Sequence, residues 1–177
     1  MAVVTRMHSI ELLPDAAGHD LVRADWTALT DAGLPSLADN TNASNAPHVT
    51  VVGAPSITAE HERLAVDLVA PMLPLTARVS GLGVLEGKRG RRALARLVEA
   101  PDPFVEAVLR LREAVGDRRY GGWLPHLSAS LRLRPEQLGP ALDALPDLED
   151  ATVTFTVLRR WDPEAGETRD LWSAPAR

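Results

Sequence analysis

The chain has 177 residues, of which 45 % are hydrophobic, and its formal net charge at pH 7 is −5. This composition is typical of one packed globular domain, and the negative charge argues against a broad basic face that binds duplex DNA. The absence of cysteine excludes disulfides, thiolate nucleophiles and cysteine-based metal sites.

Strand-like and helical patterns alternate along the chain. In chain order they predict a strand over 2–13, a helix over 14–33, a strand beginning at 48, a helix over 56–73, strands over 75–87 and 91–100, a helix over 101–116, a strand over 126–133, a helix over 134–147, and strands over 151–163 and 167–175. This order, with helices separated by strands and hairpins, is typical of an α+β or α/β fold.

Two short stretches share one pattern, and both lie at the start of a predicted strand. "APHVTVV" begins at Ala46 and "LPHLSAS" begins at Leu124, and each reads apolar, Pro, His, apolar, hydroxyl. Because strand side chains alternate between faces, each histidine points the same way as the hydroxyl two residues later. A single copy would be compatible with chance, whereas two copies indicate related halves that place equivalent strands about one cleft.

In such a cleft four groups converge, namely His48, Thr50, His126 and Ser128. Two imidazoles that titrate near neutral pH can act as general base and general acid on opposite sides of a reacting centre. Two hydroxyls can donate hydrogen bonds to non-bridging phosphate oxygens. This chemistry needs no metal or cofactor and suits the cleavage of a phosphodiester, especially a strained 2′,3′-cyclic one.

The sequence resembles the two-histidine (2H) phosphoesterase superfamily, which includes 2′-5′ RNA ligase-like proteins and RNA 2′,3′-cyclic phosphodiesterases. The resemblance rests on the motifs "HVTV" (48–51) and "HLSA" (126–129) and extends to the hairpin "ARVSGLGVLEGKRGRRALARLVE" and the opening "SIELLPDAAGHDLVRADWTAL". It implies one two-lobed α+β domain over residues 1–177, with two antiparallel sheets and flanking helices around a pseudo-two-fold cleft.

The resemblance also implies metal-independent hydrolysis of 2′,3′-cyclic phosphates to 2′-phosphates, and in some members reversible 2′-5′ ligation. His48 and His126 are then the acid–base pair, with His126 favoured as the base that activates water. Thr50 and Ser128 are the phosphate-binding residues. Val52 and Ser130 stand where many RNA-active members carry a cation, which favours a small nucleotide or RNA terminus as the substrate.

Four further residues are candidates for substrate contact. Tyr120 and Trp123 precede the second motif and could stack on a base, although a tryptophan at this position could equally belong to the core. Arg132 is the cation nearest to the motifs. His8 lies on the first predicted strand, where a structural histidine is the favoured interpretation.

Two rival functions use the same residues. One is a non-catalytic nucleotide or RNA-end binding protein, which two intact histidines disfavour because anion binding needs no pair of proton-transfer groups. The other is a ligase, or an enzyme of a different cyclic or 2′-5′ linked substrate. No signal peptide or membrane span is visible, so we expect a cytoplasmic protein. We also expect a monomer, because the fold supplies its own two-fold cleft and no heptad or exposed apolar repeat is visible.

Overall fold

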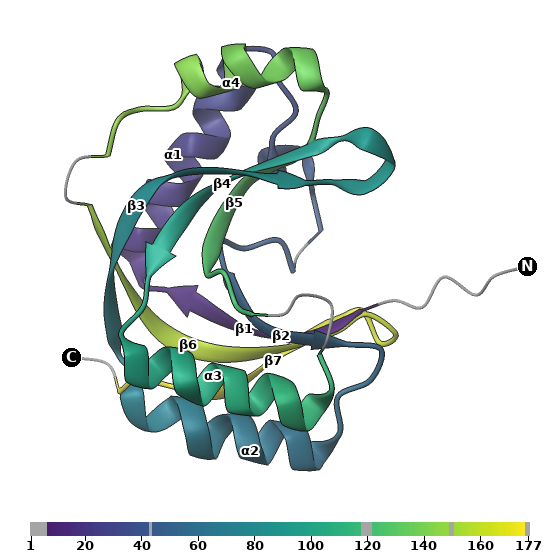
Figure 1. Cartoon of the computed structure of the whole chain (residues 1–177), viewed down its shortest axis with the longest axis vertical. Helices are drawn as coiled ribbons and strands as arrows, with labels where there is room; N and C mark the ends of the chain where they lie inside the picture. Colours follow the sequence, from purple (N-terminus) through teal and green to yellow (C-terminus); the bar gives the residue numbers. More distant parts are fainter. Residues whose placement is uncertain (1–6, 43, 118–121, 149–150, 176–177) are drawn as a thin grey trace, which may run out of the picture.

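The computed structural model describes residues 7–42, 44–117, 122–148 and 151–175 (Figure 1). Its strands and helices follow the predicted order, and only their ends differ. They are β1 (His8–Pro14), α1 (Ala16–Asp31), β2 (Val49–Ala54), α2 (Ala59–Val69), β3 (Leu75–Glu86), β4 (Arg92–Glu99), α3 (Asp102–Val115), β5 (His126–Leu133), α4 (Leu138–Ala144), β6 (Thr152–Asp162) and β7 (Glu167–Ser173).

Local chemistry sets the helix ends. The Asp15 carboxylate accepts a hydrogen bond from the Gly18 amide and caps the start of α1. Thr58 caps α2 through the amide of His61, whose ring in turn accepts from the Thr58 amide. Helix α3 ends at Gly116, which has a left-handed φ of 77° that glycine adopts without strain.

The strands form one antiparallel sheet in the order β2-β1-β6-β3-β4-β5, with β7 paired to β6. The expected division into two sheets is therefore not found. The reason is the length of β6, which pairs with β7 along its second half and with β3 near its beginning, from Thr152 to Phe155. That short ladder joins the β1-β2-β6-β7 half of the sheet to the β3-β4-β5 half.

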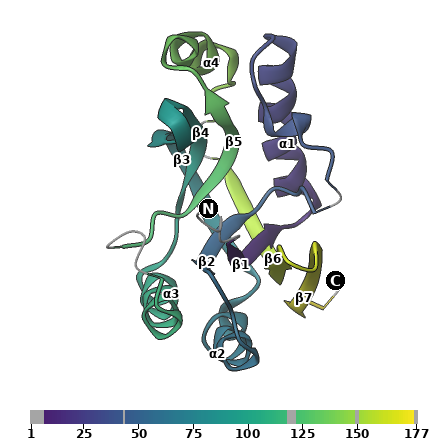
Figure 2. The ribbon, with the colours of Figure 1, turned by 90° about the vertical axis from the view of Figure 1, so that its right-hand side faces the viewer.

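The two ends of the sheet approach each other. Although β2 and β5 are last in the strand order at opposite ends, residues of the two strands contact each other. The helices cross over between the halves: α1 packs on β5, whereas α3 packs on β2 and on α2 (Figure 2). A continuous cluster of buried apolar side chains from the helices and both halves of the sheet fills the space between them.

Candidate functional site

The two motifs adopt the same local arrangement. His48 directly precedes β2 and His126 is the first residue of β5. In each motif the histidine and the hydroxyl residue are half-buried, whereas the residue that follows each of them is fully buried. This alternation is that of a strand with one face in the core, so histidine and hydroxyl share the other face, as predicted.

Both histidines are oriented by the backbone two residues earlier. Nδ1 of His48 lies 2.8 Å from the carbonyl oxygen of Ala46, and Nδ1 of His126 lies 2.8 Å from that of Leu124. Because a carbonyl oxygen only accepts hydrogen bonds, Nδ1 must carry the hydrogen in both rings. Nε2 is then the nitrogen left to accept or donate a proton toward a ligand, in both motifs.

A buried acidic residue lies beside the first motif. Glu11 on β1 is directly opposite Thr50 on β2 and Arg159 on β6, so these three residues share one face of the sheet. One Glu11 carboxylate oxygen lies 3.7 Å from His48 Nε2 and accepts a hydrogen bond of 2.7 Å from the Ser9 hydroxyl. The other oxygen accepts two hydrogen bonds, of 3.1 and 2.6 Å, from the Arg159 guanidinium.

The surroundings keep Glu11 ionised. Burial raises the pKa of this carboxyl, but the charges of His48 and Arg159 and the hydrogen bonds from Ser9 and Arg159 outweigh burial, and the pKa falls below its ordinary value of 4.5. The negative charge therefore persists at neutral pH next to His48 Nε2. Glu11 was missed in the sequence, where the only signal is one acidic residue in the apolar strand "SIELLP".

The second motif has apolar neighbours instead. On β4, Leu97 is directly opposite His126 and Ala95 is opposite Ser128, and Gly83 of β3 is opposite Ala95. Among the residues that the structure describes, no carboxylate oxygen lies within 4.0 Å of a His126 ring nitrogen. The two histidines are thus alike in backbone geometry and different in electrostatic environment.

A hydrogen bond ties the two motifs together. The indole Nε1–H of Trp123, three residues before His126, donates to the carbonyl oxygen of Thr50 at 2.9 Å. The Trp123 ring is half-buried and packs against the core, with its centroid 6.0 Å from that of Phe104. The sequence predicts that Trp123 either stacks on a base or belongs to the core. In the structure its N–H group bonds to Thr50 and its ring packs against Phe104.

The other predicted contact residues lie apart from one another. Tyr120 lies outside the described residues. His8 is buried beside Arg160, with Nδ1 3.8 Å from an Asp162 carboxylate oxygen. It lies three positions before Glu11 on the same strand, so it faces the other side of the sheet. Helix α2 covers that side, where Glu62 forms an ion pair with Arg160. The favoured structural role of His8 agrees with this placement.

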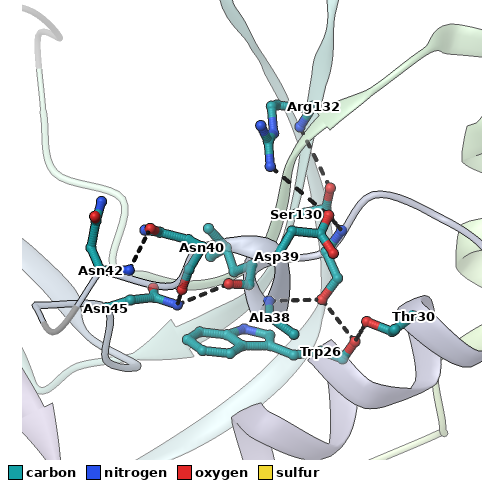
Figure 3. Close-up of polar contacts among 11 residues, drawn as sticks. Trp26, Thr30, Ala38, Asp39, Asn40, Asn42, Asn45, Ser130 and Arg132 are labelled. Atoms are coloured by element: carbon teal, nitrogen blue, oxygen red, sulfur yellow. Dashed lines mark hydrogen bonds and ion pairs between the residues drawn. The ribbon is translucent and has the colours of Figure 1, made fainter.

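Arg132 is exposed at the far end of β5 from His126. Its guanidinium lies 3.9 Å from an Asp39 carboxylate oxygen, and its amide donates to the Ser130 hydroxyl at 3.5 Å (Figure 3). The contact to Asp39 links β5 to the segment that runs from α1 to His48. Such an exposed ion pair is weak, so the Arg132 charge remains available to a ligand.

The segment before His48 is fixed by its own polar side chains. The side-chain Nδ2 of Asn45 donates to the carbonyl oxygens of Leu37 and Asn40, both at 2.8 Å, and Oδ1 of Asn40 accepts from the backbone N–H of Asn42 (Figure 3). The carbonyl of Ser44 receives a further contact of 3.4 Å from Arg159. These bonds fix the conformation of the segment that leads into the first motif.

A metal site, a pocket away from the motifs and a membrane-spanning helix are three further features that the described part of the chain could hold. No group of three or more His, Asp or Glu side chains there is close enough to hold a metal ion. Two shallow hollows lie along α2 and β7, and neither contains a motif residue. None of the described helices combines the length and apolar character that a membrane crossing requires.

No protein-family model matches the sequence, and no curated protein matches it either. Solved structures do match. The structure of Usb1 from Kluyveromyces marxianus has a TM-score of 0.55 at 12 % identity, over 96 % of this chain and 99 % of that chain. Apo LigT from E. coli has a TM-score of 0.52 at 18 % identity, over 93 % and 92 %, and LigT complexed with 3′-AMP has 0.50 at 16 %, over 97 % and 98 %.

These likenesses span nearly the whole chain. At such low identity they establish the fold, which is that of LigT and Usb1. The α+β fold expected from the resemblance to the 2H phosphoesterases is therefore confirmed. The roles of the individual motif residues rest on the site geometry described above.

Proposed function

We propose that the chain is a metal-independent phosphodiesterase that hydrolyses 2′,3′-cyclic phosphates of nucleotides or RNA ends to 2′-phosphates. The observation that carries this proposal is the pair of matching motifs, in which each histidine has Nδ1 bonded to a backbone carbonyl, so that Nε2 is the ring nitrogen left for proton transfer. Binding alone would not require two such groups, which counts against a purely binding function.

The different neighbours of the two histidines support different roles. The ionised Glu11 carboxylate lies 3.7 Å from His48 Nε2, where its negative charge can stabilise a proton donor beside the leaving oxygen. No described carboxylate lies within that range of a His126 ring nitrogen, so no carboxylate there competes for the proton that a general base takes from water. This supports the assignment of His126 as base and His48 as acid.

In the proposed reaction, His126 Nε2 accepts a proton from water while the water oxygen attacks phosphorus. The bond from phosphorus to O3′ breaks, and His48 Nε2 gives its proton to O3′. The products are a 2′-phosphate and a free 3′-hydroxyl. The Thr50 and Ser128 hydroxyls donate hydrogen bonds to the non-bridging oxygens, whose negative charge grows as the water oxygen adds. Proton exchange with solvent restores both rings.

The first test is turnover of the four 2′,3′-cyclic nucleotides in EDTA, with products assigned by ³¹P NMR. We expect 2′-phosphates from the wild type and a loss of at least about 100-fold in kcat for His48→Ala and for His126→Ala. His19→Ala is the matched control, because His19 lies on α1 and its ring accepts a hydrogen bond from the exposed Arg23. This variant should retain wild-type activity.

Two outcomes would contradict the proposal. Wild-type protein that binds these nucleotides without turnover would indicate the binding function. Turnover that survives in both histidine variants would place the chemistry elsewhere in the molecule. A mixture of 2′-phosphate and 2′-5′ linked product, formed when a 5′-hydroxyl acceptor is supplied, would add ligation to the hydrolytic activity.

A further inference from the structure

Each motif receives a hydrogen bond from an indole at the same backbone atom. Trp26 Nε1–H donates to the carbonyl oxygen of Ser128 at 2.9 Å, and Trp123 Nε1–H donates to that of Thr50, also at 2.9 Å. Ser128 and Thr50 are the equivalent hydroxyl residues of the two motifs. Two of the four tryptophans of the chain therefore contact the candidate site at corresponding positions.

The two bonds are reciprocal between the halves of the chain. Trp26 is on α1, which precedes the first motif in sequence but packs on β5 of the second motif. Trp123 follows α3 and precedes the second motif, yet bonds to β2 of the first motif. Each half thus supplies a donor to the hydroxyl residue of the other half, and the two bonds together brace β2 against β5.

Both indoles are fixed by further contacts. The Arg23 guanidinium lies 5.6 Å from the centroid of the Trp26 ring, and the Trp26 carbonyl accepts from the Thr30 and Ser36 hydroxyls (Figure 3). The Trp123 ring packs against Phe104 of α3. Trp26 is also buried in the core, and rings held in this way can impose a position on the carbonyls that they bind.

We propose that Trp26 and Trp123 are positioning residues that set the separation and orientation of the Thr50 and Ser128 hydroxyls. A hydrogen bond to the carbonyl of a residue fixes its peptide plane and so the direction of its side chain. Small displacements of groups that stabilise a transition state can cost a large part of the rate. This inference rests on the proposed function, because it assumes that these hydroxyls bind phosphate.

The test replaces each indole by a ring without the N–H group. We expect Trp26→Phe and Trp123→Phe each to lower kcat for a 2′,3′-cyclic nucleotide about tenfold, the effect of one lost hydrogen bond of about 1.4 kcal/mol. KM should stay within about twofold, since the loss acts on the transition state. Phenylalanine at 123 retains a ring able to stack on a base, so the change isolates the N–H group.

Trp172→Phe is the control, since Trp172 lies on β7 at the periphery of the core. It should leave kcat and KM unchanged. Folded Trp26→Phe and Trp123→Phe proteins, with wild-type far-UV circular dichroism, a cooperative thermal transition and kcat within twofold of wild type, would overturn the proposal. So would a tenfold loss of kcat in Trp172→Phe, because the effect would then be a general one of removing any tryptophan.

A second measurement needs neither turnover nor variants that fold well. In ¹⁵N-¹H spectra of the wild type, addition of inorganic phosphate should shift the indole signals of Trp26 and Trp123 and leave those of Trp161 and Trp172 in place. If neither of the first two signals moves, the positioning proposal fails. If both move while no cyclic nucleotide is hydrolysed, the proposed function fails and the coupling between indoles and motifs stands.

Discussion

The neighbourhoods of His48 and His126 differ far more than the motifs themselves. Both rings use Nδ1 on a carbonyl two residues back, and both hydroxyl residues accept from an indole. Yet the strand next to Thr50 supplies Glu11, whereas the strand next to Ser128 supplies Ala95. The two motifs therefore share their backbone contacts, but only His48 has a described carboxylate within 4.0 Å of its ring.

In the proposed hydrolysis, this difference gives distinct tasks to two histidines that have the same backbone geometry. Hydrolysis needs a proton donor on one side of phosphorus and a proton acceptor on the other, so two identical histidines would compete for the same protonation state. A carboxylate beside only one ring gives the two histidines different surroundings. Glu11 lies next to His48, whereas the apolar Leu97 lies opposite His126.

The largest expected effect is on kcat, in an experiment that distinguishes the proton donor from the proton acceptor by changing the leaving group of the substrate. In a cyclic substrate with sulfur in place of O3′, the departing thiolate is a weaker base than an alkoxide and needs no proton. His48→Ala should then recover to within about tenfold of wild type, whereas His126→Ala should stay at least about 100-fold slower on both substrates. Steady-state kcat values for the oxygen and sulfur substrates decide the matter.

Recovery of His126→Ala in place of His48→Ala would reverse the assignment. Recovery of neither would mean that both histidines act on water or on the non-bridging oxygens. If proton donation does not limit the rate, the wild-type protein should have similar kcat values for the oxygen and sulfur substrates. The ratio of these two kcat values is the reference for the same ratio in each variant.

A smaller effect is expected from Glu11→Gln, which keeps the shape of the side chain and removes its charge. Without the charge, His48 Nε2 loses its electrostatic contact with Glu11, and the site loses the negative charge beside its proposed proton donor. At pH 7 kcat/KM for a 2′,3′-cyclic nucleotide should fall about tenfold, corresponding to about 1.4 kcal/mol. Steady-state kinetics of the variant and the wild type measure this loss.

Asp25→Asn is the matched control for this change. Asp25 is also a buried carboxylate, and it makes two hydrogen bonds of 2.9 Å to the Arg96 guanidinium between α1 and β4. Its removal should lower the stability of the fold, as expected for breaking a buried ion pair, and leave kcat/KM at pH 7 within about twofold of wild type. A tenfold loss of kcat/KM in folded Asp25→Asn, or no loss in Glu11→Gln, would contradict a specific link between Glu11 and His48.

Local patterns in the sequence were sufficient to predict much of the molecule. The order of elements follows from periodicity and turn residues, and the strand over 126–133 has the predicted bounds. The shared face of His48 and Thr50, and of His126 and Ser128, follows from strand alternation alone. These features depend on residues within one or two positions of each other, where local stereochemistry decides.

The features that the sequence did not predict depend on the register between distant strands. Glu11 contacts His48 because β1 pairs with β2 and β6 in one particular register, with a bulge after Ile10. The single sheet depends on a four-residue ladder between β3 and β6. Similarly, alternation places His8 and Glu11 on opposite faces of β1, but only the tertiary structure shows which face carries the motif.

The smallest expected effect is on the stability of the fold, and it concerns Glu11, the carboxylate beside His48. Because the folded-state pKa of Glu11 lies below its ordinary value of 4.5, the unfolded chain binds the proton more readily. Glu11 therefore contributes stability above about pH 4.5, and this contribution is lost as the pH falls through the folded-state pKa. We expect the free energy of urea unfolding of the wild type to exceed that of Glu11→Gln at pH 7, and the gap to narrow by on the order of 1 kcal/mol at acidic pH. A gap that stays constant with pH would mean that the carboxylate charge of Glu11 contributes nothing to folding, and that its place beside His48 serves the site alone.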